Sequence, residues 1–181
     1  MMPRIDSQLS QQRWEACKST LSEEIPAFAV VEVIDAEIAR ELGSAGDEPI
    51  LRVRKVQLGE VSGDVSGYYS IPSEDYSTRG HRIRFNGPVP IPAGGFGYVT
   101  RDVPTHALCH SVFGAPTVVD NLLYVPVVNK FYLGELYEFT GDNPTNFVRV
   151  FQMAMVTSIP TDVSGCVVGY VTPQSNVRQS A

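Results

Sequence analysis

The densest group of residues that could do chemistry lies in the segment THALCH, which holds His106, Cys109 and His110. On a helix, side chains at this spacing would converge on one metal ion, whereas strand side chains alternate between two faces. The surrounding sequence is typical of a strand, which would place Cys109 opposite the two histidines and the histidines about 13 Å apart. The sequence therefore predicts neither a metal site nor a bound cofactor.

Nucleophilic catalysis would need a hydrogen bond between Cys109 and His110, but neighbours on a strand point to opposite faces. The chain also has no GxSxG elbow and no SxxK pair. A hydrolase remains a third alternative, because pairs of acid–base carboxylates are set by spatial separation that sequence does not show. Such a hydrolase could use Cys109 or the carboxylates in predicted loops and at strand ends. These carboxylates are Glu74, Asp75, Glu135, Glu138, Asp142 and Asp162. We expect no catalytic residue and no enzyme.

The segment TGDNPTN, residues 140–146, carries oxygen ligands that suit calcium. It lacks the DxDxDG spacing and the glutamate that completes a calcium loop. Asn, Pro and Gly in this order are typical of a turn. The sequence therefore predicts a turn here.

Composition narrows the class of partner. The 181 residues carry a formal charge of −6, which argues against a nucleic-acid surface because phosphate binding needs clustered Lys and Arg. The three cysteines, Cys17, Cys109 and Cys166, have no paired spacing and suggest no disulfide framework. No apolar run is long enough for a membrane span. We expect a soluble protein that is made in the cytoplasm and binds neither nucleic acid nor membrane.

The elements that must position these residues have the pattern of short strands. Strand-like runs at 14–20, 25–34 and 50–58 precede further short segments bounded by Gly, Pro, Asn and Asp. These later segments are residues 106–114, 117–128, 130–141, 146–156 and 165–173. One short helix is predicted in residues 35–47, where Gly43 would end it.

The fold class predicted is mainly β, a single-domain antiparallel β-sandwich or barrel with a short helical segment. We expect an N-terminal polar arm at 1–12, a β domain at 13–173 and a polar C-terminal tail at 174–181. Residues 60–80 are rich in Gly, Ser and Asp and should form a long loop. Long loops on a β scaffold often carry recognition.

The stretch FNGPVPIPAGGFGYVT, residues 85–100, predicts a shaped turn between two strands. Proline fixes φ and glycine reaches positive φ, so both punctuate the backbone. No Lys-Ser/Thr pair and no helix follow, which excludes a Walker phosphate loop. The residues predicted to shape this turn are Asn86, Gly87, Pro88, Pro92, Gly94, Gly95 and Gly97.

Two segments carry a resemblance to a known family. IPAFAVVEV at 25–33 and NGPVPIPAGGFG at 86–97 are similar to a pattern in small proteins encoded among the virion genes of tailed bacteriophages. The likeness covers about a third of the chain and consists of turn and strand residues. It implies a virion structural role, as capsid decoration or cement or as a tail accessory, and it transfers no active site.

The resemblance and the composition together predict a non-enzymatic virion component that assembles as a homo-oligomer, most simply a trimer, and contacts other virion proteins. Apolar and aromatic surface would be buried between subunits. The alternative is a β-sandwich module that binds a carbohydrate or a receptor through loop tyrosines. The tyrosines proposed for such a partner-facing loop are Tyr68, Tyr69 and Tyr76.

Overall fold

The computed structural model describes residues 12–38, 49–57, 82–111, 114–118, 122–127, 129–136 and 151–173. Within these ranges the chain forms two sets of strands. The first set, called barrel 1, consists of β1 (Glu15–Ser19), β2 (Val30–Ile38), β3 (Pro49–Arg54), β4 (Ile83–Asn86) and β5 (Phe96–Thr100). The second set, called barrel 2, consists of β6 (Thr105–His110), β7 (Leu123–Pro126), β8 (Leu133–Leu136), β9 (Phe151–Val156) and β10 (Cys166–Pro173).

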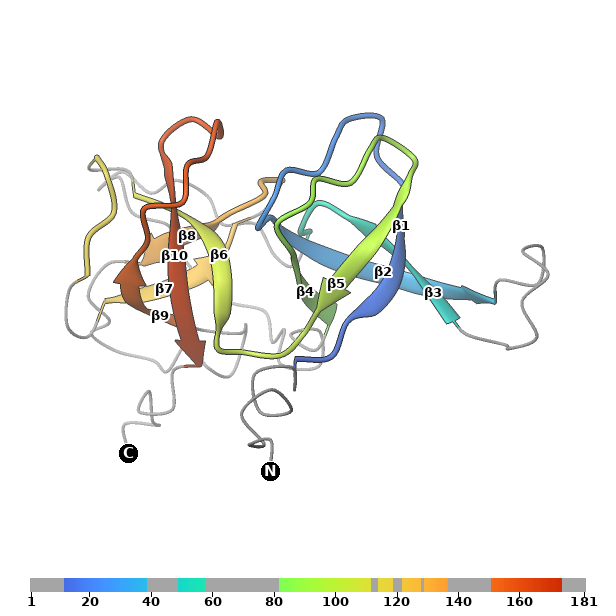
Figure 1. The fold of residues 1–181 in the computed structure, drawn as a ribbon, viewed down its shortest axis with the longest axis horizontal. Helices are drawn as coiled ribbons and strands as arrows, with labels where there is room; N and C mark the ends of the chain where they lie inside the picture. The colour runs from blue at the N-terminus through green and yellow to red at the C-terminus, as the bar shows by residue number, and fades with distance from the viewer. Residues whose placement is uncertain are drawn as a thin grey trace, which may run out of the picture.

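Each set closes into a barrel, and the two barrels lie side by side along the long axis of the molecule (Figure 1). Barrel 1 closes in the order β1-β3-β2-β4-β5, and barrel 2 in the order β6-β8-β7-β9-β10. The prediction of a mainly β fold is confirmed. The sheets are not wholly antiparallel as predicted, because β1 pairs with β3 and β6 with β8 in parallel.

Barrel 2 therefore repeats the topology of barrel 1 strand for strand, with β1 matching β6 and β5 matching β10. The register of the parallel pairs also matches, since Cys17 lies opposite Leu51 and Cys109 opposite Leu133. Closure leaves no free sheet edge, and the small interiors are filled by side chains. Cys17 and Cys109 occupy matching interior positions, and both are completely buried.

The two barrels are held together by a shared core and by backbone hydrogen bonds. The ring of Phe85 on β4 meets the ring of Phe151 on β9 edge to face, with centroids 5.3 Å apart. The amide of Val30 donates to the carbonyl of Phe131 over 2.9 Å, and the amide of Asn129 donates to Val56 over 2.8 Å. The barrels are thus packed on each other, and the short segment 101–104 joins β5 to β6.

The helix predicted in residues 35–47 is wrong for its first four residues. Asp35 and Ala36 lie in β2, where they pair with Arg52 and Leu51 of β3. The Arg52 guanidinium donates two hydrogen bonds of 2.6 Å to the Asp35 carboxylate. Cross-strand pairing therefore outweighs the helix propensity of this segment. The rest of the predicted helix, residues 39–47, lies outside the described residues.

Several predicted segments fall in parts of the chain outside the residues that the structure describes. The 60–80 loop with Tyr68, Tyr69 and Tyr76, the 140–146 turn and the 174–181 tail lie outside the described residues. Of the predicted arm, only Gln12 is described. Its side-chain amide donates to the hydroxyl of Thr105 in the same chain over 2.9 Å.

Candidate interaction surface

The outer face of β1 and β5 is aromatic. Cys17 and Gly97 pair across the two strands and point inward, so their neighbours point outward. Phe96 lies opposite Lys18, and Tyr98 lies opposite Ala16. The side chains of Phe96 and Tyr98 are 57% and 64% exposed. We call this surface the β1–β5 face; its members are Trp14, Ala16, Lys18, Phe96 and Tyr98.

Trp14, which lies just before β1, adds a third aromatic ring. Its indole lies against Gly87, where a Cβ atom would come within 3.1 Å of the ring. Any larger residue at position 87 would push the indole away. Trp14 remains 43% exposed in this position.

These aromatic residues line a groove with a volume of about 610 Å³. Its lining is mostly apolar and consists of Trp14, Asn86, Gly87, Pro88, Val89, Pro90, Phe96, Gly97 and Tyr98. A contiguous exposed apolar patch with this shape is typical of a binding surface. The groove is built by the segment predicted to be a turn, together with the start of β1.

Two matching turns lie next to the groove wall and support it. Pro26 to Ala29 and Pro92 to Gly95 each close with a hydrogen bond between their end residues, and Phe28 and Gly94 have φ values of 62° and 64°. Ile25 and Ile91 exchange two backbone hydrogen bonds. The repeated sequence Ile-Pro-Ala at 25–27 and 91–93 thus reflects two similar turns bonded to each other.

Asn86 links the first of these turns to the groove wall. Its side-chain amide donates to the carbonyls of Pro26 and Val89 over 2.9 and 3.0 Å. The amide of Phe28 donates to the carbonyl of Gly87 over 3.0 Å. The wall is therefore fixed before any partner binds, which lowers the entropy lost on binding.

One charged group lies beside the aromatic residues of the groove. The ammonium of Lys18, a member of the β1–β5 face, lies 5.7 Å from the centre of the Phe96 ring. Polar and charged side chains at the edge of an apolar centre are common in protein–protein interfaces.

The structure places the predicted turn residues as follows. Gly94 has the positive φ that favours glycine, and a Cβ on Gly95 would lie 3.1 Å from Pro92. Gly97 lies inside strand β5 and not in the turn that precedes it. Glycine is needed at position 97 because a Cβ there would lie 2.5 Å from Cγ1 of Ile91.

The THALCH segment forms β6, and its side chains alternate. The Cys109 thiol points into barrel 2, where burial raises its pKa and the carbonyl of Ala107 accepts its hydrogen bond at 3.6 Å. His106 and His110 lie on the outer side, and His110 stacks on Tyr132 with centroids 4.5 Å apart. Burial raises the pKa of Cys17 to about 11 and that of Cys166 to about 12. Burial thus disfavours the reactive thiolate at all three cysteines.

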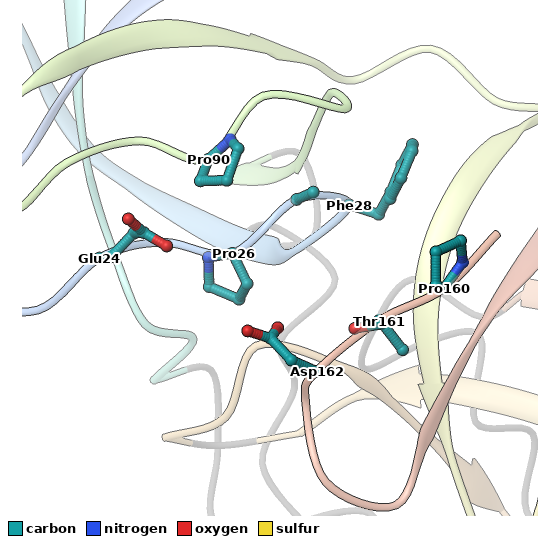
Figure 2. Close-up of a pocket in the computed structure, with 8 residues that line it drawn as sticks. Glu24, Pro26, Phe28, Pro90, Pro160, Thr161 and Asp162 are labelled. Atoms are coloured by element: carbon teal, nitrogen blue, oxygen red, sulfur yellow. The ribbon is translucent and has the colours of Figure 1, made fainter.

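A second hollow of about 380 Å³ lies between the barrels (Figure 2). Glu24 and Pro26 line it from barrel 1, and Pro160 and Asp162 line it from barrel 2. Figure 2 shows the Asp162 carboxylate pointing toward Pro26, with Glu24 beyond it. Of the other carboxylates considered for hydrolysis, Glu135 lies on β8, and Glu74, Asp75, Glu138 and Asp142 lie outside the described residues.

Among the described residues, no three His, Cys, Asp or Glu side chains are grouped as metal ligands. In the same part of the chain, no helix has the length and apolar character needed to cross a membrane.

Sequence reasoning missed the duplication, although the sequence carries its signal. Gly-Tyr-Val-Thr occurs at 97–100 in β5 and at 169–172 in β10, and Ile-Pro precedes it at 91–92 and 159–160. Cys-X-Ser occurs at 17–19 and 109–111, at the ends of β1 and β6. These repeats are too short to stand out until the matching strands are known.

Comparisons with protein-family models, curated proteins and solved structures found no match.

Proposed function

We propose that this chain is a non-enzymatic structural protein of a tailed-phage virion that assembles as a homo-oligomer through the β1–β5 face. The observation that carries the proposal is the preformed apolar groove with three exposed aromatic residues, Trp14, Phe96 and Tyr98. Aromatic residues in such a setting are typical interface anchors. A stable interface buries roughly 1,200 Å² or more, so the contact extends beyond the groove onto the rest of the face.

The resemblance to virion proteins supports the same surface. The two segments that carry it, residues 25–33 and 86–97, form the paired turns and one wall of the groove. In this proposal the protein is located in the virion, on the capsid or the tail, with other virion proteins as further partners. A trimer is the simplest closed assembly that fits.

The test is the mass in solution of the wild type and of the double variant Phe96→Ser/Tyr98→Ser, measured by light scattering. We expect an oligomer for the wild type and a monomer for the variant, because two exposed anchors are lost while the barrel interior is untouched. Met155→Ser is the matched control, since Met155 is a similarly exposed apolar residue on β9 of the other barrel.

A monomeric wild type at all concentrations would contradict the proposal, and so would a double variant of unchanged mass.

The exposed aromatic rings also suit a carbohydrate, which is the second candidate ligand for this groove. A double variant that keeps its mass but no longer binds a glycan on an array would support that second candidate.

A further inference from the structure

Because barrel 2 repeats barrel 1, the β1–β5 face has a counterpart on barrel 2, and this counterpart is covered. The residues that match the β1–β5 face are His106, Leu108 and His110 on β6 and Val168 and Tyr170 on β10, and we call them the β6–β10 face. His106 lies opposite Tyr170, and Leu108 lies opposite Val168. Leu108 and Val168 are fully buried.

The cover comes from barrel 1 of the same chain. The amide of Leu108 donates to the carbonyl of Phe28 over 2.9 Å. The Phe28 ring meets His106 edge-on at 5.8 Å, and His106 meets Tyr170 at 5.2 Å. Phe28 lies in the connection between β1 and β2, residues 20–29. The β1–β2 connection of one barrel thus packs on the β6–β10 face of the next.

The β1–β5 face has no such cover among the described residues. Tyr98 lies opposite Ala16 as Val168 lies opposite Leu108, so these two residues occupy matching positions. Tyr98 is 64% exposed and Val168 is 0% exposed, and Phe96 beside Tyr98 on the same face is also exposed. Among the described residues, the face is thus buried in one copy of the repeat, and aromatic and without a covering element in the other.

The matching element in barrel 2 lies at the opposite end of the molecule. It is the connection between β6 and β7, residues 111–122, of which Ser111, residues 114–118 and Leu122 are described. Figure 1 shows this yellow segment on the side of barrel 2 that faces away from barrel 1. It carries Val118, an apolar residue that is 48% exposed.

We propose that the occupant of the β1–β5 face is the β6–β7 connection of a second copy of this chain, through its described residues 114–118, as the β1–β2 connection covers the β6–β10 face within one chain. The copies then associate head to tail, with different surfaces on the two sides of each contact. Such a contact forms a ring if the rotation between copies closes, and a filament if it does not. This inference rests on the proposed self-assembly and specifies its geometry.

Cross-linking between two variants that each carry one accessible cysteine tests the geometry. Val89→Cys marks the groove, Val118→Cys marks the opposite end, and both changes keep Trp14, Phe96 and Tyr98 intact. Both variants carry Cys166→Ser, because Cys17 and Cys109 are buried and Cys166 is partly exposed. A short bismaleimide is added to each variant alone and to an equal mixture of the two.

We expect a covalent dimer in the mixture and no covalent dimer when either variant is treated alone. Met155→Cys mixed with Val89→Cys is the control and should give no dimer. Efficient dimer formation by Val89→Cys alone would mean that like faces meet, which overturns the head-to-tail geometry but leaves self-assembly standing. An oligomer by light scattering with no product in the mixture would also overturn it. Monomers throughout would remove the proposed function as well.

Discussion

The two barrels have the same interior and different surroundings. Cys17 and Cys109 fill matching interior positions, and the backbones of Gly97 and Gly169 hydrogen-bond to these thiols. The matching outer faces differ, because Phe28 covers the β6–β10 face while the β1–β5 face is open. Barrel closure and close packing restrict which side chains fit inside a small barrel. The side chains on the outer face depend instead on which element packs against them.

The largest expected effect tests how closely the interiors correspond. A Cβ on Gly97 would lie 2.5 Å from Cγ1 and 2.7 Å from Cδ1 of Ile91, a buried and stiff β-branched side chain. A Cβ on Gly169 would lie 2.5 Å from the sulfur of Met153, which is more adaptable. We expect Gly97→Ala to lower the free energy of unfolding by about 3 kcal/mol and Gly169→Ala by about 1 kcal/mol.

Urea denaturation of both variants beside the wild type measures this difference. The protein should be dilute enough to be monomeric, because association stabilises the folded state. Equal losses, or a larger loss at Gly169, would show that the two interiors are not filled in the way described.

A smaller effect tests the covered face against the open one. Phe28→Ala removes the half-buried ring that packs on His106, and we expect it to lower the free energy of unfolding of the monomer by about 2 kcal/mol. Phe96→Ala removes an exposed ring, and we expect a change within about 0.5 kcal/mol. Thermal or urea unfolding in dilute solution distinguishes them. A Phe96→Ala loss as large as that of Phe28→Ala would mean that the β1–β5 face is already packed within one chain.

The sequence predicted the strands well because their pattern is local. The β-branched run at 25–34 indicated the start of β2, the period-two pattern at 50–58 indicated β3, and the alternation in THALCH predicted the opposed faces of Cys109 and His106. Residues 35–38 were misassigned to a helix because their pairing with Arg52 and Leu51 joins distant parts of the chain.

The candidate site could be predicted only in part. Asn86 to Gly95 were recognised as a shaped turn, but its role as a groove wall depends on Trp14, which is far away in the sequence and lies over Gly87. Exposure of Phe96 and Tyr98 was also not predictable, since Phe is usually buried. It follows from barrel closure, which fixes which side of β5 faces outward.

The most direct test of the β1–β5 face uses Trp14, because the chain contains a single tryptophan. Its fluorescence emission and its quenching by acrylamide can be followed over a dilution series, together with the mass by light scattering, for the wild type and for Phe96→Ser/Tyr98→Ser. We predict that in the wild type the emission moves to shorter wavelength and quenching falls as the mass rises, while the double variant shows neither change. A mass that rises with concentration while the emission and quenching of Trp14 stay constant would contradict assembly through this face.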